Sequence, residues 1–253
     1  MRIALHLIYG ACKMALVLPF MHAASREQCI QRWSGKFLRI LNIRVVMHGT
    51  IPQASTTKAL FIANHISWID IWSLKQMHPV NFVAKSEVRD WPLIGWLAEK
   101  TGTIFIERAR RHDTGRTASG MEKGLRDGRC LCLFPEGTTT NGTELKPFKT
   151  GLLQAAINAD ATVWPVAIRY PNTDGTPNID VAYDGDITLW QSMRAVLKQK
   201  EVVVELHFAT PLLAQGQERR HLSHQARHAI SSLLHLPKHK APEIHDDPQA
   251  ELL

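Results

Sequence analysis

The chain has 253 residues, of which 45% are hydrophobic and 21% are charged, and its formal net charge is +7. This balance excludes a disordered chain and allows one domain with a sizeable core plus appendages. The positive charge indicates an anionic partner such as a phosphorylated substrate, an anionic lipid surface or nucleic acid. With 7% aromatic residues and no zinc-finger spacing, electrostatic nucleic-acid binding is the weakest of these three, and we expect no nucleic-acid partner.

The N-terminal residues 1–21 are largely apolar, but His6 and Lys13 interrupt them. A simple membrane span requires about 20 apolar residues with few charges. We therefore expect a helix that lies in or on the bilayer interface, and the alternative is an amphipathic helix that caps the core. Residues 26–41 continue as a basic helix with interspersed aromatic residues, a pattern that suits an anionic membrane surface. Residues 1–43 thus form a predicted membrane-associating segment.

A short apolar run, residues 59–63, predicts a buried strand, and a helical pattern starts at Ile69. His65 then lies in the turn at the carboxyl end of a strand, where α/β sheets place their chemistry. A histidine there can act as a base, and Asp70 in the first helical turn can orient it. The alternative is a capping box with Ser67 as the N-cap, in which His65 has only a structural role.

A histidine–aspartate pair usually activates a serine or cysteine of the protein. The sequence contains no Gly-x-Ser-x-Gly elbow. The pair can instead activate a hydroxyl group carried by the substrate, which turns hydrolysis into acyl transfer to an alcohol.

Strand and helix patterns alternate along the remaining chain and predict an α/β fold with a mixed, mainly parallel sheet covered by helices. The expected strands are 44–48, 80–85, 103–107, 129–134, 161–168 and 201–208, and the expected helices are 113–127, 147–159, 187–196 and 218–236. Pro165 indicates an edge, a bulge or a strand end. We expect an N-terminal segment 1–43, an α/β domain 44–214, and a C-terminal helix with a polar tail, 215–253.

Four sequence blocks in a fixed order resemble the motifs of the glycerolipid acyltransferase family, which includes the 1-acylglycerol-3-phosphate acyltransferases. The blocks are Asn64–Asp70 (Asn-His-x-Ser-x-x-Asp), Gly102–Arg108, Phe134–Thr138 (Phe-Pro-Glu-Gly-Thr) and Val163–Ile168. Each block alone is weak evidence, whereas four in order are strong. The resemblance covers roughly residues 45–210 and also suggests a membrane-dipping helical hairpin at the N-terminus.

The resemblance implies roles for individual residues. His65 and Asp70 are the expected catalytic pair. Arg108 is expected to bind the phosphate of the acyl acceptor, because a guanidinium group donates two hydrogen bonds to phosphate oxygens.

Four further residues are implied to bind substrate. Glu136 holds the acceptor's hydroxyl or headgroup region, and Gly137 and Thr138 shape the pocket. Lys85 lies in a block near the acceptor site and could bind phosphate, or it could be a strand-end lysine that faces water.

The implied activity is transfer of a fatty acyl group from acyl-CoA or acyl carrier protein to a lysolipid hydroxyl. The first expected acceptor is 1-acylglycerol 3-phosphate, which gives phosphatidic acid. The form of residues 107–111 is similar to the lyso-ornithine-lipid acyltransferase branch, so that acceptor stays open. An inactive membrane-surface binding protein is the alternative outside this class. We expect no metal and no cofactor beyond the acyl co-substrate, and a place on the cytoplasmic face of the cell membrane.

Overall fold

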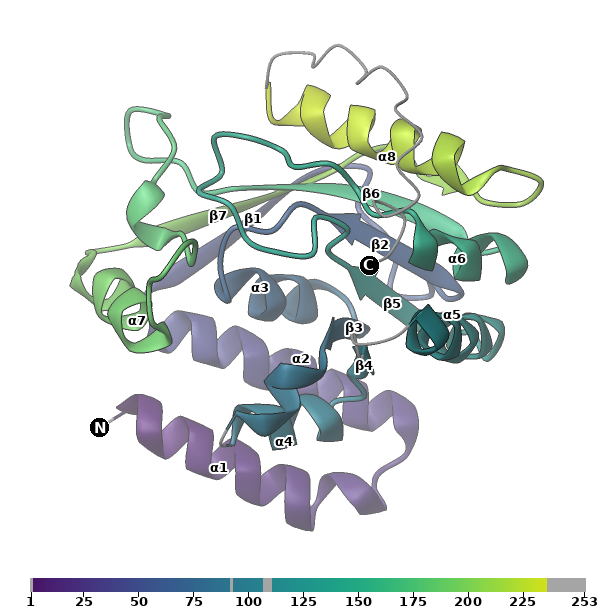
Figure 1. Cartoon of the computed structure of the whole chain (residues 1–253). Coiled ribbons are helices and arrows are strands. Elements are labelled where there is room, and N and C mark those ends of the chain that lie inside the picture. Colours follow the sequence, from purple (N-terminus) through teal and green to yellow (C-terminus); the bar gives the residue numbers. More distant parts are fainter. Residues whose placement is uncertain (1, 92, 107–110, 236–253) are drawn as a thin grey trace.

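The computed structural model describes residues 2–91, 93–106 and 111–235. Within them, eight strands form one sheet in the order β1-β7-β6-β2-β5-β3-β4, and β8 pairs with β6 (Figure 1). The strands are β1 (Ile43–Gly49), β2 (Ala59–Ala63), β3 (Val80–Lys85), β4 (Ile104–Ile106), β5 (Cys130–Leu133), β6 (Thr162–Arg169), β7 (Val202–Phe208) and β8 (Leu212–Leu213).

The sheet is mixed but mainly parallel, as the sequence predicts. β6 runs antiparallel to β7 and β8, and the other paired strands are parallel. β2 lies between β5 and β6, and all five of its residues are buried. A continuous apolar run is what a strand requires when both faces of the sheet are covered. The carboxyl end of β2 therefore lies at the edge where parallel strands place functional residues.

Helices cover both faces of the sheet. The helices are α1 (Arg2–Leu16), α2 (Ala23–Ile40), α3 (Ile69–Met77), α4 (Ile94–Lys100), α5 (Arg111–Arg126), α6 (Gln154–Asn158), α7 (Leu189–Lys198) and α8 (Arg219–Leu233). Apolar residues of α2, α3 and α7 share one buried cluster with the sheet, and those of α5, α6 and α8 share a second. A third cluster joins α1, α2 and α4. Figure 1 shows α2 and α3 on one side of the sheet and α8 on the opposite side.

The N-terminal hairpin consists of α1 packed against α2. Gly10 permits close approach, because a Cβ atom there would lie 2.4 Å from the ring of Trp33. The His6 ring stacks on the same indole with centroids 5.2 Å apart, so this polar interruption of the apolar run faces α2. Among the described residues, one segment, Arg2–Phe20, is long and apolar enough to cross a bilayer, with 22% of its residues buried.

Pro165 lies inside β6, an interior strand, so it does not mark an edge or a strand end. The bulge, the remaining predicted alternative, is confirmed, because the antiparallel register beside β6 slips by one residue between Val163 and Val166. The neighbour of β6 changes at this point, from β8 beside Thr162 and Val163 to β7 beside residues 166–169. The carbonyl of Pro165 accepts a hydrogen bond from the amide of Ala209, between those two strands. The backbone nitrogen of Pro165 faces the same gap between β7 and β8 as its carbonyl. The absence of an N–H group there therefore removes no hydrogen bond between paired strands.

The helix expected from residue 147 begins later than the sequence suggests. A 3-10 turn, Gly151–Leu153, leads into α6. The preceding residues are irregular, and the Lys149 amide donates to the carbonyl of Pro135, 2.9 Å away, which ties this segment to the turn after β5.

Candidate active site

The turn after β2 is held on several sides by hydrogen bonds. The amide side chain of Asn64 pairs with both backbone groups of Ile168, at 2.7 and 3.0 Å, and so ties the end of β2 to β6. The Thr140 amide donates to the carbonyl of His65, 2.9 Å away. The Tyr183 amide donates to the carbonyl of Ile66, also at 2.9 Å. Residues far apart in the sequence thus fix the backbone that carries the histidine.

The structure brings His65 and Asp70 together as the sequence predicts. Nδ1 of His65 lies 2.7 Å from Oδ2 of Asp70. The aspartate side chain is fully buried, whereas 18% of the histidine side chain is exposed. With Nδ1 paired to the carboxylate, Nε2 is the nitrogen that can exchange a proton with a substrate.

The capping alternative is half correct. Oδ2 of Asp70 also accepts hydrogen bonds from the amides of Ile66 and Ser67, at 2.8 and 2.9 Å. However, the N-cap of α3 is Trp68, and the Ser67 hydroxyl has no hydrogen-bond partner within the described residues. Asp70 therefore orders the turn backbone and orients the histidine at the same time.

Tyr170 is a site residue that sequence reasoning missed. Its hydroxyl donates to Oδ1 of Asp70, 100 positions earlier in the chain, at 2.5 Å. Burial, followed by the adjacent carboxylate, raises the pKa of Tyr170 well above its ordinary value, so the phenol stays a donor. Both oxygens of Asp70 therefore accept hydrogen bonds. The available signal was the position of this tyrosine, two residues after the predicted strand 161–168.

Glu136 lies behind the turn and is only 4% exposed. Oε1 accepts a hydrogen bond from the amide of His65 at 3.0 Å, and Oε2 accepts one from the amide of Lys146 at 2.9 Å. Burial raises the pKa of Glu136 to about 7, although both backbone donors oppose the rise. These contacts join the turn after β2 to the loop after β5, and the implied contact with an acyl acceptor stays a prediction.

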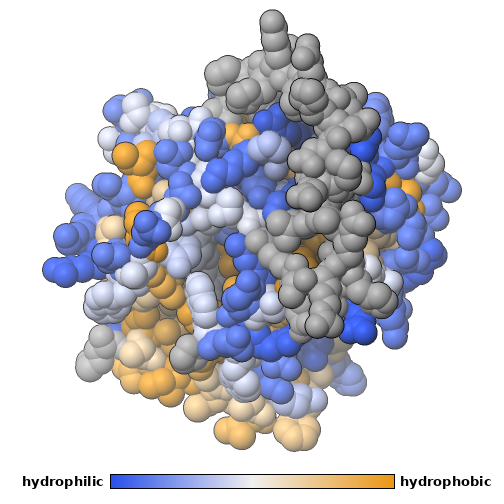
Figure 2. Space-filling model, viewed as in Figure 1, coloured by the Kyte–Doolittle hydropathy of each residue, from blue (hydrophilic) through white to orange (hydrophobic). Residues whose placement is uncertain are grey.

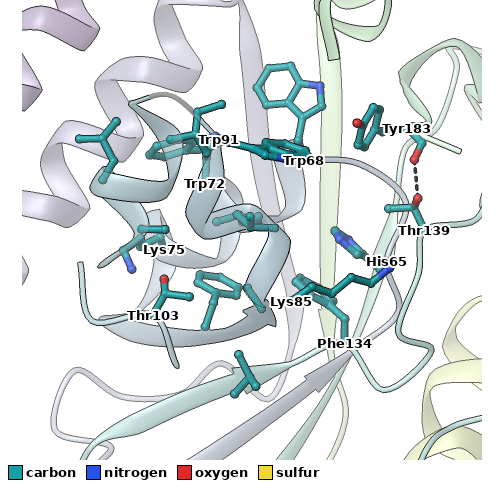
Figure 3. Close-up of a pocket in the computed structure, with 18 of the residues that line it drawn as sticks. His65, Trp68, Trp72, Lys75, Lys85, Trp91, Thr103, Phe134, Thr139 and Tyr183 are labelled. Atoms are coloured by element: carbon teal, nitrogen blue, oxygen red, sulfur yellow. Dashed lines mark hydrogen bonds between the residues drawn. The ribbon is translucent and has the colours of Figure 1, made fainter. Parts of the chain in front are cut away.

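A cavity of about 550 Å³ opens beside His65. The imidazole ring stacks on Phe134, with centroids 3.9 Å apart and planes at 8°. Figure 3 shows both rings on one wall, with Trp68 and Trp72 on another. Most of the remaining lining is apolar and comes from α3, α4 and the strand ends. An imidazole at the wall of a mostly apolar cavity suits a substrate with a long hydrocarbon part.

Of the other predicted site residues, Lys85, Gly137 and Thr138 line the same cavity. Figure 3 shows the side chain of Lys85 on the same side of the cavity as His65. Gly137 has a φ of 69°, in the left-handed region that favours glycine, and its amide closes a tight turn on the carbonyl of Phe134. Arg108 lies outside the described residues.

Lys75 is a second cavity residue that the sequence did not single out. It is 5% exposed, and its ammonium group donates to the carbonyl oxygens of Val80 at 3.0 Å and Thr101 at 3.5 Å. Burial lowers the pKa of Lys75 to about 8. The helical pattern that starts at Ile69 predicts only packing residues, so it gave no sign that the amine of Lys75 would lie on the cavity wall.

Three potential metal ligands meet on β1 and β7, although the sequence suggested no metal. The ligand atoms of His48, Glu205 and His207 lie within 4.8 Å of one another. The Glu205 carboxylate already lies 3.1 Å from Nε2 of His207 and 3.9 Å from the guanidinium of Arg169. Protein groups thus satisfy this carboxylate without an ion.

The family model described as Acyltransferase matches residues 42–169, about half of the chain. The chain is 37% identical over 205 residues to a lyso-ornithine lipid O-acyltransferase of Pseudomonas aeruginosa, covering 81% of this chain and 78% of that protein. It is 31% identical over 197 residues to a 1-acyl-sn-glycerol-3-phosphate acyltransferase of Neisseria meningitidis, covering 78% and 76%.

Among solved structures, the 1-acyl-sn-glycerophosphate acyltransferase PlsC from Thermotoga maritima matches 95% of this chain and 97% of its own, with a TM-score of 0.65 and 19% identity. This likeness shows a shared fold. The family model and the two relatives show the family as well as the fold, because they match the segment that carries the histidine–aspartate turn. The chain belongs to the acyltransferase family and is an acyltransferase.

Proposed function

We propose that the protein transfers a fatty acyl group from an acyl thioester to the hydroxyl group of a lysolipid. The observation that carries the proposal is the pairing of His65 with Asp70 at 2.7 Å on the wall of an apolar cavity. The cavity suits an acyl chain, and the imidazole suits removal of a hydroxyl proton.

In this reaction, Nε2 of His65 takes the proton of the acceptor hydroxyl as its oxygen attacks the thioester carbonyl carbon. Asp70 holds the ring and stabilises the imidazolium that forms. The tetrahedral intermediate then collapses, the carbon–sulfur bond breaks, and His65 returns the proton to the departing thiolate. The products are the acylated lipid and a free thiol.

Two acceptors are candidates for this chain. The motif resemblance suggests 1-acylglycerol 3-phosphate, which would give phosphatidic acid. The names of three relatives, 35–37% identical to this chain, favour lyso-ornithine lipid, which would give ornithine lipid. The two acceptors differ in headgroup charge, so Arg108 is central to the choice if it binds phosphate.

We also propose that the protein associates with the cytoplasmic face of the membrane through α1 and α2. Large apolar side chains of α1 and the following turn are exposed, with Phe20 at 88% and Leu16 at 69%. A cytoplasmic position would give access to acyl-CoA or acyl carrier protein and to lysolipid in the inner leaflet.

The first test measures thiol release from an acyl-CoA in the presence of each acceptor, with the wild type beside His65→Ala. We expect release that depends on one acceptor and falls at least about 10³-fold in the variant. Substitution of His221, an exposed histidine on α8, by alanine is the matched control and should leave the rate unchanged. Acyl carrier protein thioesters form a second donor arm.

Circular dichroism and a melting curve must show that His65→Ala is folded. Full acceptor-dependent release by this folded variant would refute the role of the histidine. Absence of release with each donor and acceptor would favour the inactive membrane-surface binder. An increased KM for 1-acylglycerol 3-phosphate in Arg108→Ala, with kcat retained, would support the phosphate role and that acceptor.

A further inference from the structure

Helix α7 exposes large apolar side chains beside the cavity. Trp190 is 70% exposed and Leu197 is 46% exposed, and Ile187, just before the helix, is 44% exposed. Large apolar residues on one surface helix usually mark a contact with another molecule or a membrane. Trp190 and Leu197 lie seven positions apart, so they share one face of the helix.

The exposed face of α7 continues directly from the cavity wall. Leu189 and Met193 line the cavity. Met193 lies three positions after Trp190 and four before Leu197, so it is adjacent to both on the helix surface, and Leu189 lies four positions before Met193. On the inner side, the buried Ser192 hydroxyl accepts a hydrogen bond from Nε1 of Trp68 at 3.1 Å. α7 is thus attached next to the catalytic turn, and its apolar stripe runs from the cavity out to solvent.

The opposite flank of the stripe is basic. Arg194 and Lys198 are exposed, and Lys200 follows the helix. Arg194 lies one turn after Trp190, and Lys198 directly follows Leu197. A capping box between Thr188 and Gln191 defines the start of the helix. A short helix with an aromatic and aliphatic stripe beside lysine and arginine has the pattern of helices that lie in a bilayer interface.

The N-terminal hairpin and α4 form the other rim of the cavity. Leu7 of α1 and Ile94 of α4 line it together with the α7 residues, and Ile94 is also 37% exposed. Figure 1 shows α7 and α1 on the same side of the sheet, and Figure 2 shows hydrophobic residues gathered along the lower part of the molecule, where α1 lies. The cavity therefore opens between two exposed apolar rims.

We propose that α7 is a second membrane-contacting helix, which inserts Trp190 and Leu197 into the bilayer interface and so seats the cavity mouth on the lipid surface. The occupant of this surface is an anionic bilayer, because exposed arginine and lysine border the apolar stripe. A lysolipid could then enter from the membrane without passing through water. The inference rests on the proposed function for the identity of that substrate.

The test compares vesicle binding of the full-length wild type with the double variant Trp190→Ser/Leu197→Ser. The matched control is Leu213→Ser/Ile51→Ser, because Leu213 is 70% exposed and Ile51 is 47% exposed. Neither control residue lines the cavity. The vesicles contain phosphatidylcholine alone or with phosphatidylglycerol, and binding is measured by co-sedimentation.

We expect the α7 variant to bind phosphatidylglycerol vesicles about 10-fold more weakly, whereas the control binds like the wild type. Added salt should weaken wild-type binding, because it screens the basic flank. Equal binding of the α7 variant and the wild type would overturn the proposal. The proposal would also be overturned if the wild type is a dimer in the absence of vesicles and the only effect of the α7 substitutions is to make it a monomer. The exposed face of α7 would then be an interface between copies of the chain.

Thiol release separates this proposal from the proposed function. With detergent-dispersed acceptor the α7 variant should retain the wild-type rate, and with vesicle-embedded acceptor it should lose about the same factor as in binding. If the α7 variant binds vesicles more weakly and the wild type shows no turnover, the membrane contact is supported and the activity is refuted. Normal turnover on vesicles by the α7 variant would refute the membrane contact and leave the activity intact.

Discussion

The inner wall of the cavity and its outer rim are built in opposite ways. At the inner wall, the Asp70 carboxylate is buried and accepts four hydrogen bonds, and the His65 ring lies between this carboxylate and Phe134. At the rim, Trp190 and Leu197 expose about half or more of their surface. The reacting nitrogen is therefore held by many contacts, whereas the rim leaves apolar surface exposed to solvent.

This difference separates two kinds of effect. A substitution at the turn changes the position or charge of groups that take part in the reaction, so it should change kcat. A substitution at the rim should change how the protein meets lipid and leave the chemical step unchanged. The following variants test how far the contacts at the turn account for its reactivity.

The largest effect is expected for Asp70→Asn. The asparagine carbonyl can accept the same three N–H donors, and its amide can donate to the hydroxyl of Tyr170. The fold should therefore persist, but the imidazolium of His65 loses the negative charge that stabilises it. We expect kcat to fall about 10³-fold or more, measured by thiol release.

Asp127→Asn is the matched control, because this aspartate lies exposed after α5. Circular dichroism should show both variants folded. A kcat for Asp70→Asn within a few-fold of the wild type would mean that the carboxylate only orders the backbone of the turn, as the capping alternative proposes.

Glu136→Gln should lower activity by about 10²-fold. The amide offers one acceptor to two backbone donors, so either the His65 or the Lys146 amide loses its partner. The turn then moves relative to the substrate, and a displacement of that kind costs rate even far from the reacting atoms. Glu144→Gln is the control, because Glu144 is an exposed residue of the same loop.

The same variant changes how stability depends on pH. The pKa of Glu136 rises from an ordinary value of 4.5 to about 7 on folding, so the folded chain binds more protons between these values. The contribution of Glu136 to stability is full below about pH 4.5 and is lost as the pH rises through 7. Denaturant unfolding should show a loss of up to about 3 kcal/mol in the wild type across this window, and a flatter profile in Glu136→Gln.

Most of the fold could be predicted because its signals are local. A run of apolar residues such as 59–63 indicates a buried strand wherever its neighbours lie, and alternation with helices indicates a parallel sheet. His65 and Asp70 are five positions apart, so their meeting required only the correct turn. Pro165 alone could not distinguish an edge from a bulge, because the choice depends on which strands lie beside it, and that is not a local property.

The rest of the site comes from residues that only the fold brings together. Glu136 meets His65 across 71 positions, and Tyr170 meets Asp70 across 100. The motif resemblance drew attention to Glu136 but implied a contact with substrate, whereas the observed contacts are with the backbone. Tyr170 lies just past the fourth block, and its direction depends on the pairing of β6 with β2.

The smallest effect at the turn is expected for Tyr170→Phe, which removes one hydroxyl and keeps the ring in its buried place. Oδ1 of Asp70 then loses its donor, which should cost about 1–3 kcal/mol of stability and lower kcat about 10-fold. The hydroxyl disperses the charge of the carboxylate, so without it Asp70 acts more strongly on the imidazolium of His65. The acidic limb of the kcat/KM profile should therefore move to higher pH.

That shift separates a positioning role from a packing role for Tyr170. If the ring only fills space, phenylalanine should preserve kcat and leave the midpoint of the acidic limb where it is in the wild type. If the hydroxyl positions Asp70, the midpoint moves in Tyr170→Phe and not in Tyr9→Phe, a change at an exposed tyrosine of α1. Combining Tyr170→Phe with Asp70→Asn should add little to the loss, because residues that act through one group are not additive.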